Sequence, residues 1–360
     1  MINRKFKYSQ LASLQPRRLL IIKPSALGDI CHSLPVLEYL HHRFPNSKID
    51  WVCNKSFAEI LKNHPFINEV IEFDRRASFP FKLSVAWVNL ILKLRAGQYD
   101  LVLDMQGLLR SAVMSLITGC KLRVGPFDAR EGALTFYTHL TEAVVPDTHA
   151  VMRNWSFARL FGANGLPGTG LIKPNTPSIE AVDDLLTDFP RPFWVLAPGA
   201  RWMTKRWPVG HFAEIGKRLV SNFGGTLLLV GAPDEIRLTD ELSSRLNCAF
   251  LNLGGKTAIG LLTALLSIAD LVVANDSGPL HLACSLGRPV ASPFLCTKVE
   301  LTGPYRQFSR AVVAPIHCNG SLFRKCPTNQ ECMSALTPDL LWNAIVKSFV
   351  GSPPWKIESV

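Results

Sequence analysis

Residues Ala269–Phe294 read ADLVVANDSGPLHLACSLGRPVASPF, and this stretch decides the fold. The apolar run Leu271–Ala274 is typical of a strand buried on both faces. Turn-forming residues 275–278 end it, and a helix beginning with proline is expected to follow. Val290–Phe294 then predicts the next strand. This order places a polar turn at the carboxyl end of a parallel strand, where open α/β sheets bind their ligands.

The same unit recurs along the chain. Further strands are expected at 19–22, 48–54, 69–73, 100–104, 123–125, 193–196, 226–230 and 249–253, each followed by a loop and usually by a helical pattern. Alternating strands and helices predict parallel sheets with right-handed crossovers. The Gly-, Pro- and Asn-rich stretch 162–177 is interpreted as a linker, so each half forms its own doubly wound sheet. The pattern fits the glycosyltransferase-B arrangement, in which two domains face each other across a cleft, and equally other pairs of flavodoxin-like domains.

Composition narrows the class of partner. The 360-residue chain is 48% hydrophobic and 19% charged, with a formal charge of +11, which favours a globular protein with an acidic partner such as a nucleotide, a phosphorylated glycolipid or an anionic membrane. A basic solvated surface without such a partner is the alternative. No signal peptide and no apolar run of the ~18 residues needed to cross a bilayer is visible. Basic residues 1–18, with interleaved apolar side chains, predict either a weak membrane anchor or a frayed terminus.

The cysteines suggest a reducing compartment. Nine cysteines are an odd number in a long chain, which argues against a disulfide framework and fits the cytosol. Cys318, Cys326 and Cys332 cluster near the end of the sequence without the CxxC spacing of common zinc sites. A metal site there is one hypothesis, and ordinary buried thiols are the other.

Loops of the second half carry the groups that bind a nucleoside diphosphate. Arg201 and Lys205 provide cations, Glu235 is placed to accept hydrogen bonds from ribose hydroxyls, and residues 277–281 provide main-chain N–H groups at a helix start. Trp207 is expected either beside the base or in the core.

The first half provides a carboxylate and several cations. Its first loop lacks the GxGxxG dinucleotide fingerprint and instead has Asp29 at a helix start, either as a helix cap or as the base that deprotonates an acceptor hydroxyl. Arginines in or beside loops that follow strands predict a cationic floor for an anionic substrate: Arg75, Arg76, Arg110, Arg123 and Arg130. The candidate acceptor contacts are Ser25, Gly28, Gln106, Arg110 and Arg123.

Several other chemistries lack their motifs in the sequence. There is no Walker A lysine motif, no HExxH and no nucleophile elbow. There is also no DxD, so a divalent metal is not required, and Lys205 with the helix dipole would stabilise a leaving diphosphate. We expect no cofactor. A nucleic-acid partner is not expected, because no basic stripe with interleaved aromatics occurs beyond residues 1–18.

Four stretches resemble glycosyltransferase family 9, the ADP-heptose:lipopolysaccharide heptosyltransferases. They are KPSALGDICHSLPVL, PGARWMTKRWP, VGAPDE and NDSGPLHLACSLGRPV, and the resemblance spans about residues 19–349. It implies a GT-B fold and inverting, metal-independent transfer of heptose from ADP-heptose to the lipid A–Kdo inner core. The tail HCNGSLFRKCPTNQECM looks like a degenerate form of a Cys-rich stretch found in parts of the family, and Arg201 stands where some members have a hydroxyl residue. Another donor or acceptor, or an epimerase, is the alternative.

The resemblance also implies residue roles and domain boundaries. Asp29 matches the catalytic base, Lys205 the lysine at the donor diphosphate, and Glu235 the ribose ligand. Asp276 and His281 match donor-site residues, with main-chain contacts from Ser277 and Gly278. The expected domains are 17–165 for the acceptor, 166–190 as linker, 191–336 for the donor, and a helix at 337–352 that packs back toward the N-terminal domain. The implied location is cytoplasmic, at the anionic face of the inner membrane.

Overall fold

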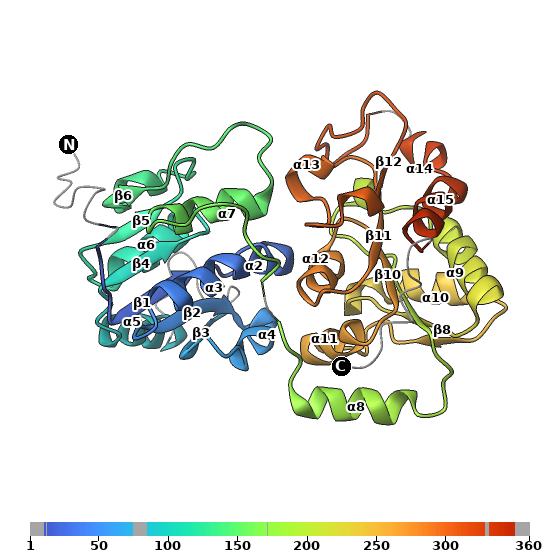
Figure 1. The fold of residues 1–360 in the computed structure, drawn as a ribbon, viewed down its shortest axis with the longest axis horizontal. Helices are drawn as coiled ribbons and strands as arrows, with labels where there is room; N and C mark the ends of the chain where they lie inside the picture. Colours follow the sequence, from blue (N-terminus) through green and yellow to red (C-terminus); the bar gives the residue numbers. More distant parts are fainter. Residues whose placement is uncertain (1–10, 12, 75–84, 171, 328–330, 350–360) are drawn as a thin grey trace. The chain divides into compact units, whose positions relative to one another are not determined.

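A computed structural model of the chain describes residues 11, 13–74, 85–170, 172–327 and 331–349. It divides into two compact units, the first ending at Ile172 and the second beginning at Lys173, within the stretch expected to be a linker. Each unit has one six-stranded sheet whose strands pair in parallel, with helices packed around it (Figure 1). The prediction of two doubly wound α/β domains is confirmed.

The first unit has the sheet order β3-β2-β1-β4-β5-β6. Its strands are β1 (Arg18–Ile22), β2 (Lys48–Asn54), β3 (Glu69–Phe73), β4 (Leu101–Asp104), β5 (Arg123–Gly125) and β6 (His139–Leu140). Its helices are α2 (Leu27–Cys31), α3 (Leu34–Arg43), α4 (Glu59–Lys62), α5 (Val85–Ala96), α6 (Leu109–Ile117) and α7 (Ala150–Arg159), with 3₁₀ turns η1 (Lys55–Phe57) and η2 (Ala133–Phe136).

The second unit repeats this topology in the order β12-β11-β10-β7-β8-β9. Its strands are β7 (Phe193–Ala197), β8 (Thr226–Leu229), β9 (Phe250–Asn252), β10 (Leu271–Ala274), β11 (Val290–Phe294) and β12 (Ala311–Val313). Its helices are α8 (Thr176–Leu186), α9 (Val209–Phe223), α10 (Ile236–Ser244), α11 (Ile259–Ser267), α12 (Gly278–Ser285), α13 (Val299–Thr302), α14 (Glu331–Ala335) and α15 (Pro338–Phe349), with 3₁₀ turns η3 (Met203–Lys205), η4 (Pro233–Glu235) and η5 (Phe308–Arg310).

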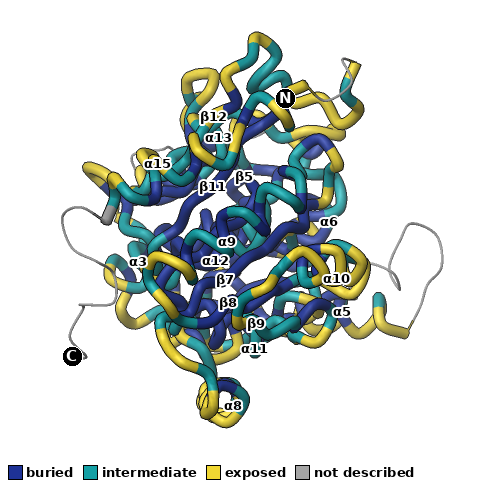
Figure 2. The backbone as a smooth tube through the Cα atoms, turned by 90° about the vertical axis from the view of Figure 1, so that its right-hand side faces the viewer, coloured by how far each residue is buried: buried dark blue, intermediate teal, exposed yellow. Residues whose placement is uncertain are grey.

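This strand order creates one switch point in each sheet. β1 pairs with both β2 and β4, and β7 pairs with both β8 and β10, so the chain winds outward in opposite directions from each central strand. At such a point the loops at the carboxyl ends of the two central strands separate to opposite faces, and a crevice opens between them. In the second unit β7 and β8 are buried along their whole length, and Figure 2 shows them in dark blue while α8 and α10 are largely exposed.

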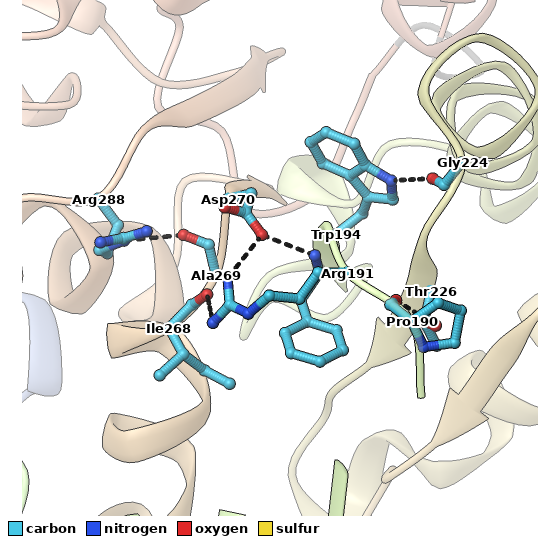
Figure 3. A network of polar contacts seen from close by, with 10 residues as sticks. Pro190, Arg191, Trp194, Gly224, Thr226, Ile268, Ala269, Asp270 and Arg288 are labelled. Carbon is cyan, nitrogen blue, oxygen red and sulfur yellow. Dashed lines mark hydrogen bonds and ion pairs between the residues drawn. The ribbon is translucent and has the colours of Figure 1, made fainter. Parts of the chain in front are cut away.

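At the opposite edge of the second sheet, polar contacts tie the amino ends of the two central strands together (Figure 3). The buried Asp270 carboxylate accepts a hydrogen bond from the Phe193 amide at 2.7 Å and lies 3.3 Å from the Arg191 guanidinium. Arg288 donates from Nε to the Ala269 carbonyl at 2.7 Å. These bonds hold β7 and β10 in register at their starts, so the loops leaving their ends begin from fixed positions.

Two segments differ from expectation. Residues 176–186, expected within a linker, form α8, which packs on α11 of the second unit. The C-terminal helix α15, expected to pack toward the N-terminal domain, instead packs on α9, β11 and β12, with Leu341 and Ile345 buried in the core of the second unit. The physical reason is its apolar face, which packs into the hydrophobic core that α9 and the sheet of the second unit share.

Some expectations fall outside the described residues. These are most of the basic N-terminal segment, residues 1–10 and 12, together with Arg75, Arg76 and residues 350–352. Among the described helices, none combines the length and the apolar character required to cross a membrane.

Candidate functional site

The strongest candidate site lies at the switch point of the second unit. Ala197 and Ala274 are paired at the ends of β7 and β10, so the loops that follow them begin side by side. The buried Asn275 side chain joins these loops, because its Nδ2 donates to the Pro198 carbonyl at 2.8 Å and its Oδ1 accepts from the Trp207 amide at 3.0 Å. The start and the end of the 198–207 loop are therefore held against β10.

Asp276, the next residue, is the centre of a charged cluster. Its Oδ2 lies 2.7 Å from Lys205 Nζ and accepts from Thr302 Oγ1 at 3.1 Å, while its Oδ1 lies 3.2 Å from His281 Nε2. Only 3% of the carboxylate side chain is exposed, against 18% of the Lys205 side chain. Burial alone would raise the pKa of the Asp276 carboxyl, but the hydrogen bond with His281 and the charges of Lys205 and His281 outweigh it, so the pKa lies well below the usual range.

The helix α12 adds main-chain donors beside this cluster. Ser277 is its N-cap residue in extended conformation, and its side chain makes no capping hydrogen bond. The Ser277 Oγ is buried and has no hydrogen-bond partner among the described residues. First-turn N–H groups of a helix have no partner within the helix, and the positive end of the helix dipole lies there. Lys205, Asp276, Ser277, Gly278 and His281 are called the cradle below, and their arrangement suits an anion with several oxygens.

Glu235 and Arg201 lie on neighbouring loops of the same sheet edge. Glu235 ends η4 after β8, and its Oε2 accepts from the Ala232 amide at 3.0 Å. Its carboxylate lies against the main chain of the β7 loop, since a Cβ atom at Gly199 would come within 2.1–2.2 Å of it. Arg201 is exposed on that loop. The structure therefore brings Glu235 to the β7 loop that also carries Lys205 and Arg201.

Trp207 does not belong to this surface. It is 1% exposed, packs edge-on against Phe212, and donates from Nε1 to the Leu336 carbonyl at 2.7 Å. The prediction that it contacts a ligand is wrong, and the core alternative holds, because the ring is used to attach the segment before α15 to the β7 loop.

In the first unit, Asp29 lies in the loop and helix that follow β1. It is exposed, and its Oδ2 accepts from the Ala26 amide at 2.8 Å, so it caps the first turn of α2. The cap and the base hypotheses are compatible. A carboxylate has two oxygens, and the Asp29 carboxylate that caps α2 also remains in contact with solvent.

Lys23 is a residue that sequence reasoning missed. It directly follows β1 and is buried, and its Nζ donates to the Met105 carbonyl after β4 at 2.7 Å. Burial lowers the pKa of this ammonium, and the negative charges of Asp29 and Asp104 partly offset that effect. The Asp104 carboxylate in turn accepts from the Gln106 and Gly107 amides at 2.9 and 3.2 Å. The only sequence signal was a lysine placed directly after a buried strand.

A cavity of about 210 Å³ opens beside these loops. Its lining contains Pro24, Ser25, Asn54, Phe73, Gln106, Leu108, Leu109, Arg110, Ser111 and Glu131. Three of the predicted acceptor contacts, Ser25, Gln106 and Arg110, are thus brought together, whereas Gly28 lies in α2 and is not among the lining residues. The Gln106 Oε1 is buried without a hydrogen-bond partner in the described part of the chain.

Arg123 is not part of this cavity. Its Nε donates to the Phe136 carbonyl at 2.9 Å, and its Nη1 donates to the Cys120 carbonyl. The guanidinium is committed to main-chain groups on either side of β5, so its expected role in acceptor binding is not supported by its position.

Comparison with known proteins identifies a matching family and several relatives. Residues 87–331 match the family described as glycosyltransferase family 9 (heptosyltransferase). The lipopolysaccharide core heptosyltransferase OpsX of Haemophilus influenzae is 26% identical over 302 residues, covering 82% of this chain and 84% of that protein. Lipopolysaccharide heptosyltransferase 1 of Pseudomonas aeruginosa is 29% identical over 333 residues, covering 87% and 89%.

Two solved heptosyltransferase structures are also similar to this chain. The E. coli heptosyltransferase WaaC with ADP is 26% identical and superposes with a TM-score of 0.71, covering 92% of this chain and 99% of that one. The E. coli ADP-heptose lipopolysaccharide heptosyltransferase II, at 21% identity and a TM-score of 0.75, shares the fold over 92% and 98%.

The Asp276 cluster predicts a pH-dependent stability difference. Asp276→Asn should lower the free energy of unfolding by about 3–5 kcal/mol near neutral pH, because it leaves the Lys205 charge without its buried partner. The folded pKa is depressed, so the contribution of Asp276 is complete above the unfolded pKa of about 3.9 and declines as the pH falls from there through the folded pKa. In urea denaturation, the difference in free energy of unfolding between wild type and variant should stay constant from about pH 5.5 to 4.5 and become smaller only below about pH 4.

The matched control is Asp339→Asn, which removes a carboxylate that is 72% exposed and paired with Arg218. It should cost less than about 1 kcal/mol. A gap for Asp276→Asn that already narrows above pH 4.5 would contradict the depressed pKa.

Proposed function

The chain belongs to glycosyltransferase family 9 and is a glycosyltransferase, and we propose that it transfers heptose from ADP-heptose to the inner core of lipopolysaccharide with inversion at the anomeric carbon. The named activity of the relatives supports the donor and acceptor classes. The observation that carries the proposal is the cradle at the switch point of the second unit, in which Lys205 and the start of α12 converge beside Asp276.

We assign the donor diphosphate to the cradle. An ammonium group has three N–H donors, and Lys205 directs its nitrogen toward Asp276 Oδ2 at 2.7 Å and the Asp276 carbonyl at 3.3 Å, which leaves donor capacity for a phosphate oxygen. The helix dipole and the first-turn N–H groups of α12 provide the rest of the positive potential. WaaC, a relative at 26% identity, has been solved with ADP.

Glu235 is assigned to the ribose. It is the carboxylate of the β8 loop, it lies against the Gly199 main chain, and an ionised carboxylate accepts hydrogen bonds from vicinal hydroxyls. Arg201 on the same edge is available for the second phosphate. No part of this assignment uses Trp207, whose ring is in the core.

Asp29 is assigned as the general base. As the acceptor hydroxyl attacks the anomeric carbon, its proton passes to the Asp29 carboxylate, the new C–O bond forms, and the bond from the anomeric carbon to the diphosphate oxygen breaks. The electron pair of that bond leaves with ADP, whose growing negative charge is stabilised by Lys205 and α12. The acceptor is assigned to the cavity lined by Ser25, Gln106 and Arg110, where a guanidinium suits an anionic sugar or phosphate.

We further place the reaction at the cytoplasmic face of the inner membrane. The acceptor class is lipid-linked, and the formal charge of +11 favours contact with an anionic surface.

The proposal is tested by incubating the purified chain with ADP-heptose and a lipid A–Kdo acceptor and reading the products by mass spectrometry. We expect the acceptor to gain one heptose. Parallel reactions with ADP-glucose and UDP-N-acetylglucosamine separate heptosyl transfer from the alternative of another donor or an epimerase. Transfer from one of those donors alone would overturn the donor assignment.

Asp29→Asn should reduce kcat about a hundredfold to ten-thousandfold, because the carboxylate that accepts the proton is lost while its size is kept. The dissociation constant for ADP, measured by calorimetry, should change by less than about twofold, since ADP is assigned to the other unit. Asp184→Asn, an exposed acid on α8, is the control and should keep wild-type turnover. Retained turnover in Asp29→Asn would refute the base.

Lys205→Ala should weaken ADP binding about tenfold to a hundredfold, the range expected for one charged hydrogen bond, about 1.5–3 kcal/mol. The matched control is Lys256→Ala, which removes an exposed lysine from the neighbouring strand-end loop after β9. Calorimetric titration of both variants with ADP decides between a specific contact and a general effect of positive charge. Equal weakening in both variants would count against the cradle.

A further inference from the structure

Four cysteines of the second unit line one small cavity, and Thr204 of the 198–207 loop, which we call the donor loop, lines it as well. Cys296 follows β11, Cys318 and Cys326 lie in the irregular segment after β12, and Cys332 lies in α14. We call these four residues the thiol cluster. The cavity holds about 20 Å³, and its remaining lining consists of Thr204, Leu295, Ser321, Phe323, Pro327 and Met333.

The four side chains are reduced thiols that influence one another. None of them forms a disulfide. Burial and the neighbouring Cys318, Cys326 and Cys296 together raise the pKa of the Cys332 thiol to about 11. The four thiols come from three separate segments of the chain and line one void.

The segment that carries Cys318 and Cys326 has little apolar anchoring. From Ala314 to Pro327 it has no helix or strand, and it exposes 45% of Leu322 and 51% of Phe323. Its described attachment to the sheet includes a hydrogen bond from the Leu322 amide to the Cys296 carbonyl at 2.8 Å, which places the segment against one member of the cluster. A segment of this length without secondary structure usually has another constraint.

We propose that the thiol cluster is a structural site for a thiophilic divalent metal ion of the zinc class, bound by Cys296, Cys318, Cys326 and Cys332. Four sulfur ligands suit the tetrahedral geometry and soft character of such an ion, with metal–sulfur distances of about 2.3 Å. Among the described side chains, no three His, Cys, Asp or Glu residues are arranged closely enough to hold an ion. Binding therefore requires the thiols to lose their protons and turn about χ1 toward the cavity, as ligands close around a metal when it binds.

The site would support the donor loop. Thr204 lines the cavity together with Cys296, and it directly precedes Lys205 of the cradle. A metal bound here would restrain η3, which contains Thr204 and Lys205, without contacting the donor. This consequence rests on the proposed function, whereas the metal site itself does not.

The test measures metal in the full chain. After expression with zinc and iron available, desalting and gel filtration, elemental analysis should give about one equivalent of a single thiophilic metal per chain. Replacement by Co²⁺ should give the visible d–d bands of a tetrahedral thiolate site and a sulfur-to-metal charge-transfer band. Cys318→Ser and Cys326→Ser should each lower the metal content at least tenfold. The matched control is Cys248→Ser, a partly buried thiol outside the cluster, which should keep the wild-type content.

Two outcomes overturn the proposal: wild-type chain without bound metal that gives no Co²⁺ spectrum, or a disulfide within the cluster in protein purified without reductant. Should the serine variants fail to fold, the wild-type metal content and Co²⁺ spectrum still decide. Release of the metal with a mercurial should weaken ADP binding at least threefold. Bound metal with unchanged ADP binding would overturn the link to the donor loop, and the absence of heptosyl transfer would overturn the proposed function while leaving the metal result intact.

Discussion

The parallel pairing of β7 with β10 is the constraint on which the candidate donor site depends. It places Ala197 beside Ala274, and the two loops that follow would separate at once if nothing held them. The buried Asn275, at the start of the second loop, holds them together. Its side-chain amide forms hydrogen bonds with Pro198 and Trp207, the two ends of the first loop. A buried amide is costly unless all its hydrogen bonds are made, so its position is tightly specified. Lys205 is thereby delivered to Asp276 by the shape of the main chain and not only by charge attraction.

The charges of the cradle then divide into a fixed part and an available part. Asp276 is almost fully buried and accepts from three side chains, so its negative charge is neutralised internally. Lys205 is more exposed, and its ammonium is oriented by the contact with Asp276. An ammonium that is already oriented loses less freedom when it meets a phosphate than an unrestrained surface lysine would. The carboxylate therefore lowers the net charge of the site but improves its geometry.

Local patterns in the sequence were enough to predict ten of the twelve described strands and the chemistry-bearing loops, but not the short edge strands β6 and β12. Buried parallel strands are short apolar runs, and Asp29, Glu235, Asp276 and His281 stand in the turns or first helical turns that follow such runs. The errors came from long-range packing. Trp207 stands between charged residues and a helix start, yet its ring is buried by contact with Leu336, 129 residues later. Arg123 resembles a surface cation, but main-chain carbonyls around β5 accept its hydrogen bonds.

At both switch points a lysine joins the loops that follow the two central strands, but the two lysines differ in burial and in partner. In each unit a lysine from the loop after the first central strand reaches the turn that follows the second: Lys23 contacts Met105 in the first unit, and Lys205 contacts Asp276 in the second. Lys23 is buried against a carbonyl, and burial lowers its pKa, so it joins the loops but presents no charge to solvent. Lys205 is paired with a carboxylate and remains partly exposed. Because a partly exposed ammonium can reach a diphosphate and a buried one cannot, the same topology provides a structural contact in one unit and, in the other, the group that we assign to the donor diphosphate.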